Sequence, residues 1–348
     1  MELQQLHQGN EQLFTAFAES RTGGRSENQD SYGYAQTERG FLVTVCDGMG
    51  GGPGGKTAST IAVREIIEGV TGASSDEEPT NVLIKAIRRA NMAIIEAANE
   101  EPALKGMGST ATVLLLAEHA AYAAFVGDSR IYQLRGRKKV FRTFDHSMVF
   151  DLVKQHVITE EQARLSAQSN IITRALGIKP DVEVDVHELP YEKGDRFILC
   201  SDGIHGTMPE KDLLKMLTQK KPIGVVTDDV ATYVDNLGRL SGQGYDNLTL
   251  AMIETRTDSI LKPAMSKQTK LLLLMLVAIC LISVAINFIQ HSRYSTMSET
   301  MREFKVNRDS LVQYTYRDSV QRTAIKSLQD SIAKMNKKME EINKLTKQ

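Results

Sequence analysis

The chain has 348 residues, of which 41% are hydrophobic and 24% are charged, an ordinary globular composition that suffices for one large domain or two smaller ones. Its formal net charge is −1, so it has no basic excess to bind a phosphate backbone, and nucleic acid is not expected as a partner. Three scattered cysteines without a C-x-x-C pair exclude a disulfide framework and a cysteine zinc site, and favour a reducing compartment.

The first part of the chain reads as a polar leader, 1–12, followed by a mixed domain over 13–255. The leader lacks the basic and apolar regions of a secretory signal, so we expect the domain to stay in the cytosol. Alternating patterns predict a hairpin over 32–46, at least three strands within 111–143 and another hairpin over 182–202. Helices are expected over 58–70, 79–100 and 209–218. Strands adjacent in sequence should therefore be mostly antiparallel.

A basic linker, 256–270, leads to the uncharged segment LLLLMLVAICLISVAINFI, residues 271–289. As a helix this segment reaches about 28 Å, close to the roughly 30 Å hydrocarbon core of a bilayer. We interpret it as a transmembrane span, with a buried core helix as the alternative. Because the domain carries no signal sequence, we place it in the cytoplasm of a single-pass cell-membrane protein and the tail, 290–348, outside. The basic residues on either side give only a weak bias.

The tail contains an apolar seam of heptad type. Its members repeat at spacings of 3, 4, 3, 4 and 3 residues: Ile325, Leu328, Ile332, Met335, Met339 and Ile342. Such a seam is typical of a short coiled coil, which predicts possible self-association of the helical tail. An amphipathic helix lying on a partner or on the membrane is the alternative.

The stretch VTVCDGMGGGPGGKTAST, residues 43–60, permits two interpretations. From Gly50 it matches the P-loop template, with Gly55, Lys56 and Thr57 completing a nucleotide-binding loop. From Asp47 it is an apolar strand that ends in Asp-Gly, which would place a carboxylate beside a metal. A P-loop belongs to a mostly parallel sheet, whereas this strand is half of a predicted hairpin. The second interpretation is therefore favoured.

Three other aspartates share this setting. Asp128 and Asp202 each follow an apolar strand, and Asp246 immediately precedes one. A single Asp-Gly is a common solvated turn, but carboxylates at several strand ends can converge, and such oxygen ligands suit Mg²⁺ or Mn²⁺. In RSENQDSYG, Arg25 supplies a planar guanidinium suited to a phosphate.

At this point the sequence resembles the metal-dependent, type 2C serine/threonine protein phosphatases, especially their bacterial members. The resemblance covers about 13–255 and runs in order through GRSENQDSYG, FLVTVCDGMGGGPGGKTAS, GMGSTATVLLL, AAFVGDSRIY, DHSMVFDLVKQHVITEEQA, NIITRALG, GDRFILCSDGI and GYDNLTLAMI. It implies an α+β fold, a four-layer αββα sandwich of two antiparallel sheets flanked by helices, here followed by the transmembrane helix and helical tail.

The resemblance also implies two Mn²⁺ or Mg²⁺ ions and a third, weaker metal position. Asp47 would bridge the first two, with the Gly48 carbonyl on the second. The remaining implied roles are Asp202 and Asp246 on the first metal, Asp128 on the third, Arg25 on the substrate phosphate, and Asp30 in orienting metal-bound water. A hydroxide between the two metals would then attack phosphorus directly.

The implied activity is hydrolysis of phosphoserine and phosphothreonine in proteins, with substrates or autophosphorylated forms of serine/threonine kinases as partners. Met49 and Gln29 depart from better-known members, which have a histidine and an acid at these positions. His146, at the start of the flap 146–170, is expected to cap the next helix, and Cys46 and Cys200 to be packed thiols. The alternatives are a catalytically weak phosphoprotein-binding signalling module and, with less support, a P-loop nucleotidase.

Overall fold

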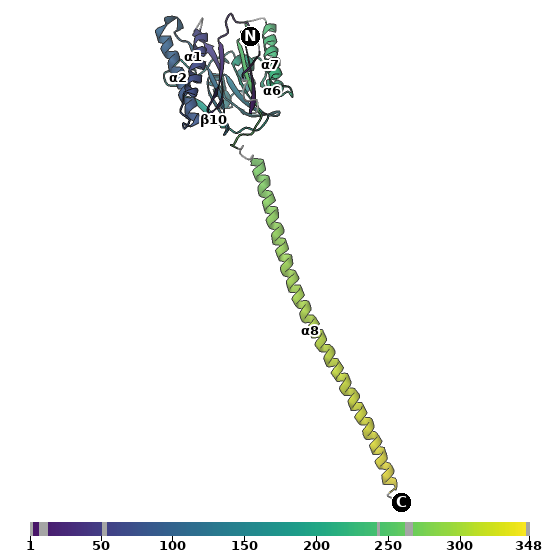
Figure 1. The fold of residues 1–348 in the computed structure, drawn as a ribbon. Coiled ribbons are helices and arrows are strands. Elements are labelled where there is room, and N and C mark those ends of the chain that lie inside the picture. Colours follow the sequence, from purple (N-terminus) through teal and green to yellow (C-terminus); the bar gives the residue numbers. More distant parts are fainter. Residues whose placement is uncertain (1–2, 7–12, 51–53, 242–243, 262–266, 346–348) are drawn as a thin grey trace. The chain divides into compact units, whose positions relative to one another are not determined.

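The computed structural model describes residues 3–6, 13–50, 54–241, 244–261 and 267–345. It divides into two units, Met1–Pro263 and Ala264–Gln348, which we describe separately. The first unit is built from two stacked antiparallel sheets, with α1 and α2 on one side and α6 and α7 on the other (Figure 1). The predicted αββα sandwich is confirmed.

Each sheet is antiparallel at every pairing between described strands. The first sheet contains, in spatial order, β1 (Gln4–Gln5), β2 (Phe14–Arg21), β12 (Leu248–Thr255), β11 (Asp195–Cys200), β8 (Arg130–Arg135) and β9 (Lys138–Arg142). The second contains β10 (Asp185–Leu189), β7 (Ala121–Val126), β6 (Ala111–Leu116), β4 (Gly40–Met49) and β3 (Asp30–Thr37), with β5 (Gly108–Ser109) paired to β4.

The alternation of side chains along β4 explains why the sheets stack. Phe41, Val43 and Val45 point into the core between the sheets, where the Phe41 ring stacks on Phe14 at 4.3 Å between centroids. Leu42 and Cys46 point the other way, into the core beneath the helices. Because successive residues of a strand face opposite sides, a strand buried on both faces is mostly apolar, and the buried Thr44 of β4 donates to the Thr112 carbonyl at 3.0 Å.

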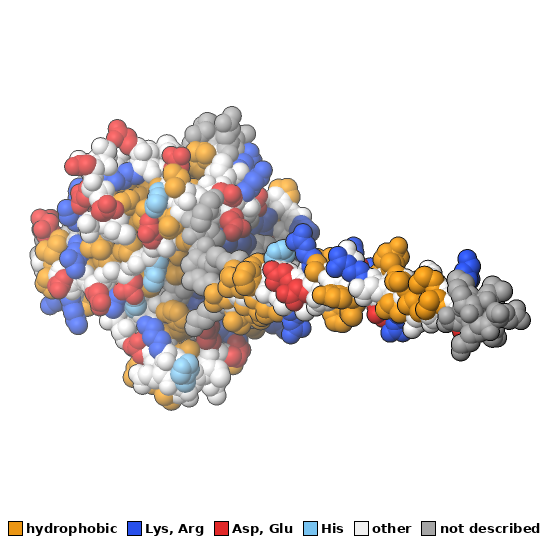
Figure 2. Space-filling model, turned by 90° about the horizontal axis from the view of Figure 1, so that it is seen from below, with side chains coloured by type: hydrophobic (Ala, Val, Ile, Leu, Met, Phe, Trp, Pro, Cys, Tyr) orange, Lys and Arg blue, Asp and Glu red, His pale blue; other side chains and the backbone are white. Residues whose placement is uncertain are grey.

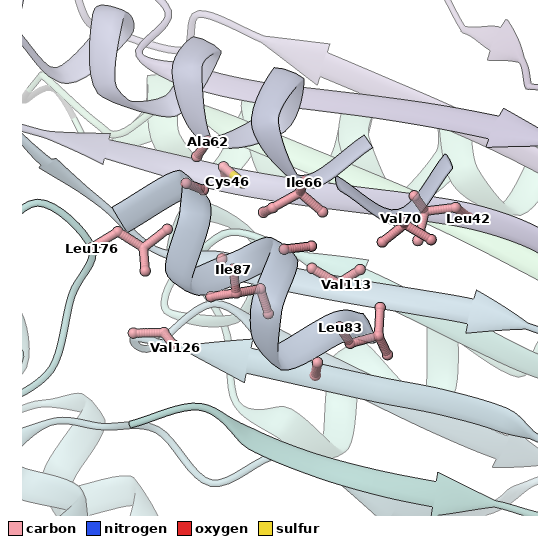
Figure 3. Close-up of a cluster of buried hydrophobic side chains, with 14 of the residues drawn as sticks. Leu42, Cys46, Ala62, Ile66, Val70, Leu83, Ile87, Val113, Val126 and Leu176 are labelled. Carbon is pink, nitrogen blue, oxygen red and sulfur yellow. The ribbon is translucent and has the colours of Figure 1, made fainter. Parts of the chain in front are cut away.

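Helices cover the outer faces of both sheets. The second sheet is covered by α1 (Gly54–Thr71) and α2 (Pro79–Glu100), whose apolar faces meet it in the cluster drawn in Figure 3. Over the first sheet lie α6 (Glu210–Leu217) and α7 (Ile223–Leu240). The remaining helices are short: η1 (Pro102–Leu104), α3 (Met148–Lys154), α4 (Glu160–Arg164) and α5 (Asp202–His205).

The thiols of Cys46 and Cys200 are buried in these outer cores, as expected. Burial raises the pKa of each to about 12, since a thiolate would lose its solvation there. Neither thiol is available as a nucleophile.

One secondary-structure prediction was wrong, and one long helix was missed. The hairpin expected over 182–202 does not form, because β10 pairs with β7 in the second sheet while β11 pairs with β8 and β12 in the first. Alternation identified both strands correctly, but it carries no information about their partners. The long helix α7 was not predicted at all.

The ends of the first unit also differ from the expected boundaries. Leu6, assigned to the leader, is fully buried between the sheets, and its N–H donates to the Ala16 carbonyl at 3.0 Å. At the other end, the N–H groups of Arg256, Ser259 and Leu261 bond to carbonyls of the unit at 2.8–2.9 Å. Parts of the expected leader and linker therefore pack against the first unit, and such short packed segments carry no periodic signal in the sequence.

The second unit is one helix, α8 (Lys267–Leu345), which confirms the helical tail. It contains the apolar segment 271–289 and is, among the described residues, the one helix long and apolar enough to cross a membrane. Apolar side chains recur along it in Figure 2. Five members of the predicted seam, Ile325 to Met339, are 49–64% exposed, and the side chain of Ile342 lies outside the described residues.

Candidate active site

The predicted site residues meet at the end of the sandwich where the chain crosses between the sheets. Residues 22–29 lead from β2 to β3, and 127–129 lead from β7 to β8. At this same end β4 pairs Asp47 with Asp30 of β3. The chain here encloses a cleft of about 470 Å³, lined by Arg25, Ser26, Glu27, Gln29, Asp47, Gly48, Met49, Thr110, Asp128, Asn170, Ile172, Asp202, Asp246 and Asn247.

All but one of the predicted site residues line this cleft. The exception is Asp30, which is only 2% exposed and lies behind the wall formed by its strand neighbour Asp47. Its Oδ2 accepts a hydrogen bond of 2.7 Å from Ser201 Oγ, and Ser201 also accepts from Thr249 N–H at 3.0 Å. Asp30 is thus fixed in place by the strand that carries Asp202.

Backbone contacts hold Asp47 and Gly48 at the cleft. Thr110 accepts from Asp47 N–H at 2.9 Å and returns a bond from its own N–H to the Asp47 carbonyl at 2.8 Å. A Cβ on Gly48 would lie 1.9 Å from the Gly55 carbonyl oxygen and 2.7 Å from that of Gln29. Only glycine allows this close approach of three backbone segments.

Two carboxylate oxygens at the site have no hydrogen-bond partner. Asp30 Oδ1 and Asp202 Oδ1 are buried and unsatisfied among the described residues. A buried acceptor without a partner is costly, and more so when it belongs to a charged group. The unsatisfied Asp202 oxygen lies at the cleft, where a water or a cation could be its partner.

Like charge and burial act together on the carboxylates. Burial, followed by repulsion from Asp30 and Asp202, raises the pKa of Asp47 well above its usual value. Burial raises the pKa of Asp30 to about 7, and burial with repulsion from Asp246 raises that of Asp202 to about 6. Burial also raises the pKa of Asp128. Within the described chain, no ion pair neutralises Asp30, Asp47, Asp128 or Asp202.

The donor set suits a hard divalent cation. Within the described ranges no three acidic, histidine or cysteine side chains form a ready-made metal cage. Mg²⁺ does not need one, because it keeps several waters and is usually bound through one or two carboxylates. Aspartates that are mostly buried or partly buried, one peptide carbonyl and unsatisfied oxygens therefore fit Mg²⁺ or Mn²⁺ and no soft metal.

Arg25 and Asp246 form the more exposed rim of the cleft. Arg25 Nη2 donates to Asp246 Oδ2 at 3.2 Å, and the two side chains are 52% and 38% exposed. The neighbouring Asn247 holds the Arg25 loop: its Nδ2 donates to the carbonyls of Thr22 and Glu27 at 2.7 and 2.9 Å. No role was predicted for Asn247 from the sequence, although the block GYDN contained it.

Two histidines support the turn that carries Asp128. His205 Nε2 lies 3.0 Å from the Asp128 carbonyl oxygen, and His146 Nδ1 accepts from Gly127 N–H at 3.1 Å. Burial lowers the pKa of both imidazoles, which keeps them neutral. The expectation that His146 caps α3 was wrong, because Ser147 accepts from Phe150 N–H instead. His205 was missed, since a histidine after Asp-Gly-Ile carries no distinctive signal.

The contacts of Lys56 distinguish between the P-loop and the metal-site interpretations of residues 43–60. Its Nζ donates to the Asp30 carbonyl at 2.8 Å and to Ser31 Oγ at 3.1 Å, so it fastens α1 to β3. The strand before it lies in an antiparallel sheet, unlike a P-loop strand. Residues 51–53 of the glycine-rich stretch lie outside the described residues. The P-loop interpretation was wrong, and the match arose from glycines needed beside Gly48.

The segment 146–170 forms a small two-helix flap beside the cleft. Val149 and Phe150 of α3 pack against Ala163 of α4 in a separate apolar cluster. Arg142, whose side chain is 4% exposed, pairs with Glu160 of the flap at 2.6 Å and with Glu210 of α6 at 2.8 Å. Arg142 therefore ties the flap to the first sheet, and Arg130 of β8 adds a contact of 4.9 Å to the Phe150 ring.

Comparison with known proteins agrees with this geometry. The sequence profile of the family described as Protein phosphatase 2C matches residues 19–238. The chain is 34% identical to the serine/threonine phosphatase stp of Listeria innocua over 246 residues, 70% of this chain and 96% of that one. It is 31% identical to the protein phosphatase PhpP of Streptococcus pneumoniae over 234 residues, 66% and 92% of the two chains.

Solved structures show the same fold. The serine/threonine phosphatase Stp1 of Staphylococcus aureus superposes with a TM-score of 0.62 at 29% identity, over 69% of this chain and 94% of that one. The catalytic domain of the protein phosphatase PstP, in complex with two manganese ions, gives 0.59 at 29% identity, over 70% and 99%. The chain therefore belongs to the protein phosphatase 2C family and is a metal-dependent serine/threonine phosphatase like its bacterial relatives.

Proposed function

We propose that this chain is a membrane-anchored protein serine/threonine phosphatase that works with two Mn²⁺ or Mg²⁺ ions. In this proposal Asp47, the Gly48 carbonyl, Asp202 and Asp246 hold the two ions, and Asp128 contributes to a third, weaker site. The observation that carries it is the pair of buried, unsatisfied carboxylate oxygens on Asp30 and Asp202, among aspartates that no protein cation neutralises. A relative solved with two manganese ions supports it.

The bound ions would lower the pKa of a water so that it can act as the nucleophile, and would neutralise charge on the phosphoryl oxygens. Arg25, which is half-exposed at the rim, exchanges Asp246 for the substrate phosphate and orients it. Asp30, from behind Asp47, uses its free oxygen to orient water in the cleft. Met49 lines the cleft but cannot donate a proton, so the serine or threonine leaving group takes its proton from water or from another group.

A catalytically weak phosphoprotein-binding module remains the second candidate. Such a module could lose any of the acidic ligands without penalty. The four aspartates and the backbone supports of Asp47 are all in place in this chain, which favours the enzyme. A module would bind phosphopeptide without turning it over.

We further propose that α8 anchors the enzyme in the cell membrane through 271–289, with the first unit in the cytoplasm and the tail outside. The support is the length and apolar character of this segment. Phosphorylated kinase substrates, or autophosphorylated serine/threonine kinases, would then be substrates. The exposed seam from Ile325 to Met339 would associate with a second copy as a coiled coil.

The test is hydrolysis of a phosphothreonine peptide by the full chain in detergent micelles, with Mn²⁺ and with chelator. We expect turnover that depends on metal and is abolished by Asp47→Asn and by Asp202→Asn. Lys56→Ala should keep the phosphatase activity. A Lys56→Ala variant that lost ATP binding together with turnover would instead favour the P-loop nucleotidase. Turnover that survives chelator or Asp47→Asn would contradict the two-metal mechanism. Phosphopeptide binding without turnover would favour the binding module. Protease accessibility of residues 290–348 in intact cells tests the orientation.

A further inference from the structure

A groove rich in basic residues lies on the outer side of the first sheet. We call it the basic groove. It has a volume of about 830 Å³ and is lined by Arg137, Glu210, Lys211, Leu214, Lys215, Thr218, Gln219, Lys220 and Lys221. Arg137 comes from the turn between β8 and β9, and the others come from α6 and the connection that follows it. Two separate elements thus contribute cations to one groove.

Most of this positive charge is not neutralised by the chain. Lys221 pairs with Asp229 at 2.6 Å, but Arg137, Lys211, Lys215 and Lys220 form no ion pair with any described residue. The acid that lines the groove, Glu210, is already bonded to Lys139 and Arg142. The exposed Asp212 on α6 is not part of the lining. In a chain with a net charge of −1, such a concentration of free cations stands out.

The basic groove is connected to the catalytic cleft. A second pocket of about 430 Å³ lies between them, beside the flap. It shares Glu210 and Lys211 with the basic groove and Asp128, Asn170, Asp202 and Asp246 with the catalytic cleft. Phe150 and Ala163 of the flap give this flap pocket an apolar wall. A continuous surface therefore leads from the site of hydrolysis to the free lysines.

We propose that the basic groove binds an acidic segment of the phosphoprotein substrate, a few residues away from the phosphorylated serine or threonine. The flap pocket holds the residues between them. The eight residues of α6 are about 12 Å long, which an extended segment of about four residues would follow. This inference rests on the proposed phosphatase function. The connection to the cleft favours a substrate over an anionic membrane surface, which would need no such continuity.

The test compares full-length wild type with Lys211→Gln/Lys215→Gln/Lys220→Gln in detergent micelles with Mn²⁺. Substrates are phosphothreonine peptides that carry four acidic residues before or after the phosphothreonine, and a matched neutral peptide. Lys105→Gln/Lys179→Gln/Lys193→Gln is the control, because it removes the same charge from exposed lysines outside the groove. p-Nitrophenyl phosphate reports the chemistry alone.

We expect one acidic peptide to have a lower KM than the neutral peptide, and the groove variant to raise that KM about tenfold, because exposed charge pairs are individually weak but add up. The kcat, the neutral peptide and p-nitrophenyl phosphate should be unaffected, and so should the control variant. Equal KM values for all peptides in wild type would overturn the docking proposal while leaving the phosphatase intact. Absence of turnover of every substrate would instead overturn the proposed function.

Anionic lipid is tested in the same framework. The full chain is placed in nanodiscs of phosphatidylcholine alone or with one fifth phosphatidylserine. If the groove variant differs from wild type only in its response to phosphatidylserine, and not in peptide KM, the groove serves the membrane and the substrate proposal is wrong. An unchanged peptide effect in both lipids supports it.

Discussion

The aspartates at the two ends of β11 differ in whether the chain provides hydrogen-bond partners for their carboxylate oxygens. At its start, Asp195 is fully buried and bonded by Arg135 through both carboxylate oxygens at 2.8 Å, with Gln133 adding a bond of 2.9 Å. Just past its end, Asp202 is only partly buried, its buried Oδ1 is unsatisfied among the described residues, and its close charged neighbours are other aspartates, apart from Arg25 at the rim. The same strand thus supports one carboxylate that the chain satisfies and one that it leaves incomplete.

In the proposed function, Asp195 is a structural acid and Asp202 is a metal ligand. Burying a carboxylate without a partner costs free energy, so a fold under selection for stability alone would neutralise both ends. At the Asp202 end the deficit is concentrated beside a solvent-accessible cleft, where a divalent cation can remove it. The predictions below test this contrast, starting with the largest effect.

Replacing Asp47 by Asn should reduce kcat for a phosphothreonine peptide by about 10³-fold, because in the proposed function it removes a ligand of cations that contribute several kcal/mol. Steady-state hydrolysis with saturating Mn²⁺ measures this. The matched Asp195→Asn variant should keep near-normal kcat per folded molecule. A comparable loss of kcat in Asp47→Asn and Asp195→Asn would contradict a functional difference between the catalytic aspartates and Asp195.

The reverse holds for stability. Asp195→Asn should lower the free energy of unfolding of the first unit by about 3 kcal/mol, because Arg135 and Gln133 lose their buried acceptor. Denaturant titration of the full chain in micelles, followed by tyrosine circular dichroism, measures it. Rescue by Asp195→Glu is not expected, since the longer side chain cannot keep both bonds. A change below about 1 kcal/mol would mean that the Asp195 end is not a structural anchor.

Without metal, the first unit should lose stability as the pH rises from about 4 to about 7. The folded-state pKa values of Asp202, about 6, and Asp30, about 7, exceed the ordinary 3.8, so the folded state binds protons more tightly than the unfolded state. The change for Asp202 alone corresponds to roughly 3 kcal/mol. Unfolding in chelator at several pH values measures the slope, which Asp202→Asn should reduce. A slope of the opposite sign would contradict the charge repulsion described here.

A smaller effect is expected at His205. His205→Ala removes the bond to the Asp128 carbonyl. In the proposed function Asp128 is a metal ligand, and loss of a residue that positions a metal ligand typically weakens metal binding, so the Mn²⁺ concentration for half-maximal activity should rise about tenfold. His205→Gln can place an amide N–H nearby and should recover part of the affinity. A purely structural role would lower stability without shifting the metal dependence.

Sequence patterns predicted which aspartates line the cleft better than they predicted the contacts that hold them in place. Asp47, Asp128 and Asp202 could be singled out because a strand end followed by a turn is visible in sequence, and the sandwich followed from the resemblance. Partners of strands were not visible, so β10 and β11 were wrongly joined as a hairpin. Thr110, Asn247 and His205 act through backbone atoms of residues far away in the chain, and such contacts appear only after folding.

The central claim is that the aspartates at the Asp202 end are left unneutralised for a divalent cation. Scanning calorimetry of wild type and Asp202→Asn, each with chelator and with Mn²⁺ at pH 7.5, tests it most directly. We predict a crossover: in chelator Asp202→Asn melts above wild type because repulsion is relieved, whereas with Mn²⁺ wild type gains several degrees and melts above the variant. An Asp202→Asn variant that melts below wild type in chelator, or a wild type that Mn²⁺ does not stabilise, would contradict the claim.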